Sequence, residues 1–212
     1  MTAQQGHLWN LLGQRAPVSE IAAQLGISEA EARLSVLEVL RDLNTAYRDV
    51  WDDATGAPLV PWSVWIDRVT GVENRSAAEQ YLSWLLEASR RSGWSLSVVF
   101  ADLDGLKRVN DASGHSAGDR LLWKVAQTFV RSVRRTDKVF RWGGDEFLVV
   151  FPRSDLATAH AFLSRVRQAA PDLKFSAGVA AWEPTDTVAD LVDRADRAMY
   201  ADKTRRVCRL RS

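Results

Sequence analysis

Two adjacent acidic residues, Asp145 and Glu146, lie between apolar runs in the segment KVFRWGGDEFLVVF (residues 138–151). The preceding pair, Gly143 and Gly144, predicts a β-hairpin turn, because glycine enters the positive-φ region without steric cost. Neighbouring carboxylates repel each other unless water or a positive charge offsets the repulsion. The hairpin tip is therefore either a solvated turn or part of a cation site.

A second acidic pair, Asp102 and Asp104, ends the apolar run SLSVVFADLD (residues 95–104), which we expect to be a buried strand. A D-x-D pattern alone is more typical of a strand that ends in a polar turn. Mg²⁺, however, prefers hard oxygen ligands and commonly takes one or two carboxylates together with substrate phosphates. Together with the acidic hairpin, on a strand able to lie beside it, the pattern favours a divalent-cation site.

Polar residues that suit a purine nucleotide follow this strand. Lys107 offers a point charge for phosphate, Asn110 offers an N–H to a guanine carbonyl, and Asp119 accepts from guanine N–H groups. Taken singly, an Asn or Asp near a helix end is most often a cap. His115 is more typical of a hydrogen-bonded loop histidine than of a catalyst.

Helix and strand patterns alternate after residue 62. The central order, β-α-β-β-α-β, predicts an α+β fold of the ferredoxin-like kind, with helices on one face of a mostly antiparallel sheet. The expected elements are helices at 76–91, 118–135, 154–169 and 187–203, strands at 95–104 and 173–182, and the hairpin at 138–151.

The first 50 residues are interpreted as a small helical N-terminal lobe, joined by a linker at 51–62 to a larger domain at 63–212. The segment VSEIAAQLGISEAEARLSVLEVLRDL resembles a helix-turn-helix, with a turn at Gly26 and a capping box of Ser28 and Glu31. Residues 1–60 hold four basic and eight acidic residues, a net charge of −4, against 24 basic and 19 acidic residues in the remainder, a net charge of +5. DNA affinity comes largely from cationic neutralisation of phosphates. We therefore rank dimerisation or partner binding above DNA binding, and expect nucleotides to bind the larger domain.

The cysteine count, the N-terminal segment and the length of the apolar runs bear on where in the cell the protein is expected. A single cysteine, Cys208, excludes an intrachain disulfide and a multi-cysteine metal site. The start, MTAQQGHLWN, lacks the pattern of a signal peptide, and no apolar run approaches the ~20 residues that span a bilayer. We expect a cytoplasmic protein without a membrane segment.

Four segments together resemble the successive motifs of the GGDEF family, the diguanylate cyclases. They are DRVTGVENR, FADLDGLKRVND, GHSAGD and RWGGDEF, in family order and at family spacing, and the resemblance runs from about residue 67 to the end. It implies a fold related to class III nucleotide cyclases and polymerase palms. It also implies an enzyme that joins two GTP into cyclic di-GMP with release of two pyrophosphates. Such an enzyme requires Mg²⁺ or Mn²⁺ and works as a homodimer whose subunits each bind one GTP.

The resemblance assigns roles to single residues. Asp102, the backbone carbonyl of Leu103 and Asp145 look like metal ligands, with Asp145 also the candidate base for the ribose 3′-hydroxyl and Glu146 a supporting acid. The positions that resemble substrate contacts are Lys107 and Lys203 for phosphate, Asn110 and Asp119 for guanine, His115 in the substrate loop, and Gly143 and Gly144 where the nucleotide approaches the backbone.

The C-terminal segment YADKTRRVCRL departs from the family ending Tyr-x-x-Lys-x-x-Gly-Arg-Asn. Tyr200 and Lys203 match, whereas the glycine and asparagine are absent and the arginine is displaced. We assign the phosphate contact to Arg206, with Arg205 as the alternative.

An R-x-x-D pattern, Arg134 to Asp137, precedes the hairpin. In isolation it would be read as a solvated charge cluster. At this offset from the signature, the resemblance implies an inhibitory site for cyclic di-GMP, in which Arg134 pairs with phosphate or guanine, Asp137 accepts from guanine, and Arg165 adds a further arginine.

Two alternatives stay open. One is a degenerate GGDEF domain that binds GTP or cyclic di-GMP without catalysis, although Asp102, Asp145 and Glu146 are all retained. The other is a transcription factor in which such a domain is the sensor for a DNA-binding N-terminal lobe.

Overall fold

The computed structural model describes residues 18–28 and 65–209 of the 212-residue chain. The chain divides into two compact units, Met1–Val60 and Pro61–Ser212. In the part of the chain that is described, every helix is too short or too polar to cross a membrane.

The first unit contains α2 (Val18–Leu25), which ends at Gly26 with a φ of 65°. The N–H of Ile27 donates to the Ala22 carbonyl at 3.1 Å and closes the helix. This agrees with the first helix and the glycine turn of the expected helix-turn-helix. The second helix, Glu31 of the capping box and the linker at 51–62 lie outside the described residues.

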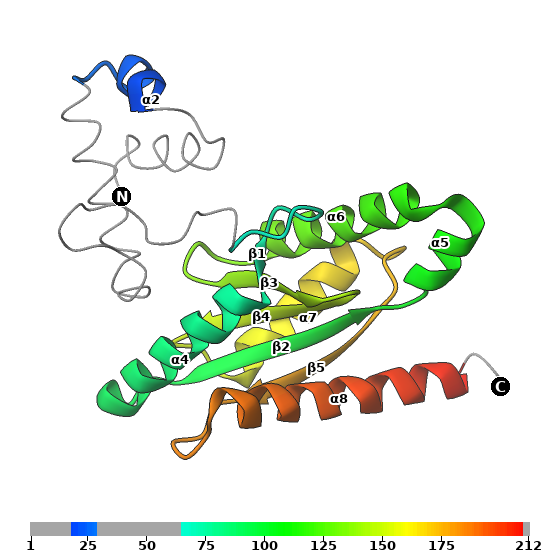
Figure 1. Ribbon diagram of the computed structural model, residues 1–212. Helices are drawn as coiled ribbons and strands as arrows, with labels where there is room; N and C mark the ends of the chain where they lie inside the picture. Colours follow the sequence, from blue (N-terminus) through cyan, green and yellow to red (C-terminus); the bar gives the residue numbers. More distant parts are fainter. Residues whose placement is uncertain (1–17, 29–64, 210–212) are drawn as a thin grey trace. The chain divides into compact units, whose positions relative to one another are not determined.

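The second unit is built on a five-stranded sheet in the order β1-β3-β4-β2-β5 (Figure 1). All neighbouring strands are antiparallel except β1 and β3, which are parallel. The order places β2 between β4 and β5, as the β-α-β-β-α-β topology requires, so the ferredoxin-like expectation is confirmed. The strands are β1 (Glu73–Asn74), β2 (Leu96–Leu103), β3 (Lys138–Gly143), β4 (Glu146–Pro152) and β5 (Phe175–Ala181).

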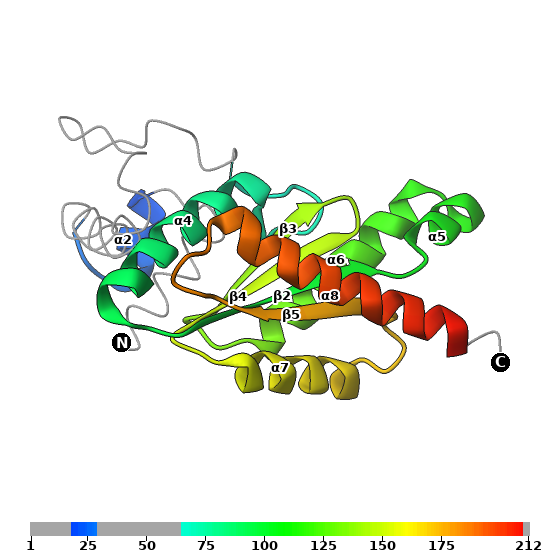
Figure 2. The ribbon, with the colours of Figure 1, turned by 90° about the horizontal axis from the view of Figure 1, so that it is seen from below.

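Helices cover both faces of this sheet (Figure 1, Figure 2). On one face lie α6 (His115–Ser132) and α7 (Leu156–Ala169), and on the other lie α4 (Arg75–Ser92) and α8 (Val188–Arg209). The expectation of helices on one face was wrong, because α4 and α8, which flank the β-α-β-β-α-β unit in sequence, cover the second face. Consequently β2 is buried at all eight residues, since its alternating side chains meet a helical layer on either side.

Phe129 of α6 lies at the centre of the apolar layer between the sheet, α6 and α7. Its ring centroid is 5.6 Å from Phe147, 5.5 Å from Phe162 and 5.4 Å from Phe175, in edge-on contacts. Such aromatic pairs add about 0.5–1.5 kcal/mol each beyond the burial of apolar area. This layer holds α6 and α7 against β4 and β5, the strands that flank β2.

Helix α6 begins at His115, three residues before its expected start at Gly118. Gly114 has a φ of 79° and lets the chain turn from α5 (Leu106–Ser113) directly into α6. The expected nucleotide-binding residues Lys107, Asn110, His115 and Asp119 therefore lie on α5 and α6, two helices that follow β2 and are joined by a single glycine.

Candidate active site

The two acidic motifs meet at one end of the sheet. In the β2–β4 ladder Asp102 lies opposite Glu146, and the N–H of Leu103 donates to the carbonyl oxygen of Asp145 at 3.0 Å. Antiparallel pairing thus brings together the four residues expected to hold a metal.

The hairpin tip is held by Arg141. The turn residue Gly144 has a φ of 47°, a conformation that a side chain would strain. Arg141 donates from Nε and Nη2 to the Gly144 carbonyl at 3.1 and 2.6 Å, and from Nη1 to both carboxylate oxygens of Asp67 at 3.0 Å. Sequence reasoning missed Arg141 and Asp67 as site residues, although each lies in a motif quoted above. The tip that carries Asp145 is therefore tied to the loop before β1.

Asp67 is fixed from two sides. Besides Arg141, it accepts hydrogen bonds from the backbone N–H and hydroxyl of Thr70 at 2.9 and 2.7 Å. Burial raises the pKa of Asp67, but the bonds from Thr70 and Arg141 outweigh burial and hold that pKa below its usual value of 3.8. Asp67 is therefore an ionised anchor at neutral pH.

Lys203 reaches the acidic residues from α8. Its Nζ donates to Asp102 Oδ1 at 2.7 Å. The hydrogen bond to Asp102 raises the pKa of Lys203, and attraction to Asp104 and Asp145 adds to the rise. Asp104 is also held by the Ser176 hydroxyl, which donates to its Oδ1 at 3.0 Å. A cationic side chain thus lies among the acids expected to hold a metal.

Glu146 lies near three other carboxylates and near the guanidinium of Arg75. Burial raises the pKa of Glu146, repulsion from Asp102, Asp196 and Asp145 raises it further, and attraction to Arg75 lowers it. Like charges of the hairpin and of β2 thus lie close together at this end of the sheet. A cation at this position would relieve the repulsion.

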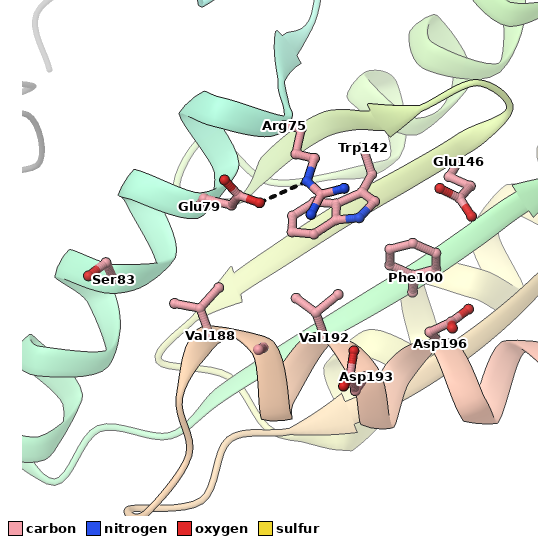
Figure 3. A pocket seen from close by; sticks show the side chains of 11 residues that line it. Arg75, Glu79, Ser83, Phe100, Trp142, Glu146, Val188, Val192, Asp193 and Asp196 are labelled. Atoms are coloured by element: carbon pink, nitrogen blue, oxygen red, sulfur yellow. Dashed lines mark hydrogen bonds and ion pairs between the residues drawn. The ribbon is translucent and has the colours of Figure 1, made fainter.

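Glu146 also lines a cavity of about 510 Å³ between α4 and α8 (Figure 3). Phe100 and Trp142 lie beneath it on the sheet, with their ring centroids 6.0 Å apart. Arg75 stacks 4.7 Å from the Trp142 ring centroid and donates to Glu79 at 2.8 Å. On the sheet side the cavity thus presents two aromatic rings and the Glu146 carboxylate. The remaining lining residues are Ser83, Val188, Ala189, Val192, Asp193 and Asp196.

The carboxylates fit a divalent cation that keeps open coordination positions. Asp102, Asp145 and Glu146 supply hard oxygen donors. Among the described residues, no three His, Cys, Asp or Glu side chains are already gathered as a complete metal site. Mg²⁺ usually keeps waters and takes substrate phosphates beside one or two protein carboxylates.

Asn110 and Gly118 pack together where α5 contacts α6. The Oδ1 atom of Asn110 is buried without a hydrogen-bond partner, and a Cβ atom on Gly118 would lie 2.0 Å from it. The buried atom is an acceptor, so the NH₂ group of Asn110 is the part of the amide that could donate to a guanine carbonyl. Lys107, His115 and Asp119 are exposed on the same two helices.

The structure separates the two basic residues expected at the phosphates. Arg206 donates to Asp202 at 3.1 Å, whereas Lys203 contacts Asp102. Asp202 also accepts from the Ala177 N–H at 3.2 Å. Arg205, the alternative to Arg206, donates to a carbonyl of its own helix. Lys203, and not Arg206, therefore lies at the carboxylates.

A family model described as "Diguanylate cyclase, GGDEF domain" matches residues 64–207. The chain belongs to the GGDEF family. Diguanylate cyclase DgcP of Pseudomonas aeruginosa is 33% identical over 148 residues, which cover 65% of this chain and 22% of that protein. Diguanylate cyclase DosC of Escherichia coli is 30% identical over 184 residues, which cover 81% of this chain and 39% of that protein. The chain thus spans well under half the length of these relatives.

Solved structures of GGDEF proteins share the fold. The GGDEF domain of DgcB from Caulobacter crescentus, crystallised with cyclic di-GMP, matches with a TM-score of 0.65 and 26% identity over 70% of this chain and 93% of that one. Diguanylate cyclase SiaD from Pseudomonas aeruginosa, in complex with its activator SiaC, matches with a TM-score of 0.66 and 30% identity over 94% of this chain and 77% of that one. The family expected from the motifs is confirmed.

The R-x-x-D segment of this GGDEF domain forms a tight turn between α6 and β3. Asp137 is buried, and its carboxylate accepts from the Arg134 N–H at 2.9 Å and the Thr136 hydroxyl at 3.3 Å. Arg165 of α7 donates to the Ser132 carbonyl at 3.0 and 3.3 Å. The structure thus brings Arg134 and Arg165 to the same end of α6, and turns Asp137 toward its own loop.

Proposed function

We propose that this GGDEF domain is a diguanylate cyclase, which joins two GTP molecules into cyclic di-GMP with release of two pyrophosphates. The observation that carries the proposal is the meeting of Asp102, Asp145 and Glu146 at one end of the sheet, in a chain that belongs to this family. Similarity to proteins named diguanylate cyclase supports it.

Each of the two bond-forming steps is a phosphoryl transfer. The ribose 3′-oxygen of one GTP bonds to the α-phosphorus of the other, and the bond from that phosphorus to the departing pyrophosphate breaks. We assign to Asp145 the acceptance of the 3′-hydroxyl proton. Arg141 holds the turn in which Asp145 lies, which matters because positioning supplies much of the rate in such transfers.

We further propose that Mg²⁺ or Mn²⁺ is required. Asp102, the Leu103 carbonyl, Asp145 and Glu146 would hold the ion. When bound, it would neutralise charge on the phosphate oxygens.

GTP is selected over ATP by two polar residues of the α5–α6 pair in this proposal. Asn110 donates to the guanine carbonyl, and Asp119 accepts from the guanine N–H groups. Adenine presents an amino group where guanine presents its carbonyl, so it would offer no acceptor to the Asn110 NH₂ group. The other proposed substrate contacts are Lys107, His115, Gly143, Gly144, Lys203 and Arg206.

Catalysis requires two copies of the domain, because each copy carries one set of these residues and binds one GTP. We propose that the N-terminal lobe helps two copies to associate, and that DNA is not its partner. The need for GTP favours a cytoplasmic location.

We also propose that cyclic di-GMP inhibits the enzyme through Arg134, Asp137 and Arg165. Arg134 and Arg165 lie near each other at the end of α6, and guanidinium groups pair bidentately with phosphate or with a guanine edge. The crystallised DgcB domain, which carries cyclic di-GMP, supports product binding by a domain of this fold.

The alternative is a degenerate domain that binds GTP or cyclic di-GMP and regulates a DNA-binding N-terminal lobe. The departure of the C-terminal segment from the family pattern favours this alternative, because the side chain of Arg206 donates a hydrogen bond to Asp202. To separate the two, the purified protein is incubated with Mg²⁺ and either GTP or ATP, and the products are identified by mass. We expect cyclic di-GMP from GTP alone, and none from Asp145→Ala at unchanged circular dichroism. GTP binding without a cyclic product, even at high protein concentration, would establish the degenerate domain instead.

A further inference from the structure

The ammonium group of Lys203 contacts a carboxylate that is proposed to hold the metal ion. Its Nζ lies 2.7 Å from Oδ1 of Asp102, whose side chain is only 11% exposed at the end of β2. Asp104 and Asp145 attract the same ammonium. The acids proposed to hold a dication are therefore already partly neutralised by a residue of α8.

We infer that Lys203 is an internal counter-ion that competes with the metal until a nucleotide draws it away. This rests on the proposed function and concerns the regulation of the same site. An ammonium and a dication at one carboxylate oxygen repel each other, because both are positive. In this inference the ammonium weakens binding of the ion at Asp102, and its departure strengthens that binding.

The way Lys203 is held allows it to leave. Among the described residues, Asp102 is the only hydrogen-bond acceptor of its ammonium, and the Lys203 side chain is 42% exposed. Arg141 differs, because it is held by both Asp67 and the Gly144 carbonyl and is only 15% exposed. Arg141 is thus a fixed clamp, whereas Lys203 has a single contact on a flexible four-carbon stem.

The consequence is coupling between metal and nucleotide. A triphosphate offers Lys203 more negative charge than one carboxylate, so GTP frees Asp102 for the ion. Because such coupling is reciprocal, the ion must also strengthen nucleotide binding. Such a protein binds the metal ion weakly in the absence of nucleotide, and it binds the ion and GTP cooperatively.

Mn²⁺ binding without nucleotide tests the inference, because it needs no turnover. Free Mn²⁺ is counted by its electron paramagnetic resonance signal during titration of wild type and Lys203→Gln. We expect Lys203→Gln to bind Mn²⁺ about tenfold more tightly, which is ~1.4 kcal/mol. Arg197→Gln, which removes an exposed positive charge from the same helix, should match wild type. Adding Asp102→Asn to Lys203→Gln should abolish the gain.

The titration is then repeated with 3′-deoxy-GTP, which lacks the attacking hydroxyl. We expect this nucleotide to tighten Mn²⁺ binding to wild type by a larger factor than binding to Lys203→Gln. Equal or weaker Mn²⁺ affinity of nucleotide-free Lys203→Gln, or no measurable binding by it at millimolar Mn²⁺, would overturn the inference alone. If neither protein bound Mn²⁺ even with 3′-deoxy-GTP, the proposed metal-dependent function would fail as well.

Thermal melting gives a second readout. Without metal, Lys203→Gln leaves the buried Asp102 carboxylate without its counter-ion, so it should melt below wild type. Mn²⁺ should then raise its melting temperature more than that of wild type. If Lys203 only stabilised the fold, Lys203→Gln would melt below wild type, but Mn²⁺ would not raise its melting temperature more than that of wild type.

Discussion

Arg141 and Asp67 form an ion pair across 74 positions of the sequence, in which one guanidinium nitrogen lies 3.0 Å from both carboxylate oxygens. The same guanidinium holds the carbonyl of Gly144, the residue before Asp145. The position of the Asp145 carboxylate, which is proposed to be catalytic, therefore depends on a loop that comes before β1, α4 and β2 in the sequence.

Arg141→Lys should impair catalysis more than stability. Lysine keeps the charge but cannot contact Asp67 and the Gly144 carbonyl together in the planar geometry of a guanidinium. We expect turnover of GTP to fall about 100-fold, as small displacements of reacting groups do, and the free energy of unfolding to fall by about 1–2 kcal/mol. Arg91→Lys, at an exposed pair with Glu87, should change neither. Unimpaired turnover of Arg141→Lys would exclude the positioning role.

Gly118→Ala should weaken GTP binding with little loss of stability. The new Cβ would lie 2.0 Å from Asn110 Oδ1, and that side chain can move away, while alanine is favoured over glycine in a helix by about 1 kcal/mol. We expect the KM for GTP to rise about tenfold at a near-wild-type melting temperature. An unchanged KM would show that the Asn110 amide does not read the substrate.

Gly178→Ala is the matched comparison, because its Cβ meets backbone instead of a side chain. It would lie 2.1 Å from the Ala195 carbonyl oxygen and 2.1 Å from the Met199 nitrogen. α8 must then move off β5, and we expect a loss of about 3 kcal/mol in urea denaturation. A stability close to that of Gly118→Ala would contradict this close approach.

Acid should weaken the loop between β5 and α8. Arg194 donates to Asp186 at 2.5 and 2.6 Å, and the Glu183 N–H donates to it at 2.7 Å. The bonds from Arg194 hold the pKa of Asp186 below 3.8, although burial opposes them. Since this pKa is lower in the folded than in the unfolded chain, the stabilisation is complete above pH 3.8 and is lost as the pH falls below that value.

Asp186→Asn should therefore be about 2 kcal/mol less stable than wild type at pH 7, with the difference shrinking below pH 3.8. Urea denaturation across this pH range measures it. Asp172→Asn, at an exposed position, should follow wild type throughout. A constant difference for Asp186→Asn at all pH values would argue against the ion pair.

Arg134→Ala should relieve product inhibition. We expect cyclic di-GMP to bind wild type in the micromolar range, about −8 kcal/mol, and Arg134→Ala at least tenfold more weakly, because a guanidinium contact to the product is lost. Calorimetry measures both affinities. In progress curves, turnover by the variant should slow at a higher product concentration than turnover by wild type. Equal affinities and identical progress curves would show that this turn is not the inhibitory site.

The sequence by itself determined the acidic hairpin, the family and the order of the main strands and helices, but it did not predict β1 or α5. Those features are local, because apolar periodicity, glycine turns and contiguous motifs such as RWGGDEF are carried by neighbouring residues. The sequence also links Asp102 with Asp145, because each lies at the end of a predicted strand and paired strands bring such ends together. The expectation that helices cover one face failed, because periodicity shows that a helix is amphipathic but not which face of the sheet it covers.

Only the tertiary structure decided which partner holds each of the supporting residues. Arg141 with Asp67, Lys203 with Asp102 and Arg165 with Ser132 each join elements far apart in the chain. From the sequence alone, each of these charged side chains looks like an ordinary charge on the solvated surface. Its partner is set by strand order and by the distance at which α7 and α8 pack on the sheet, and these depend on the whole core and not on any local pattern of residues.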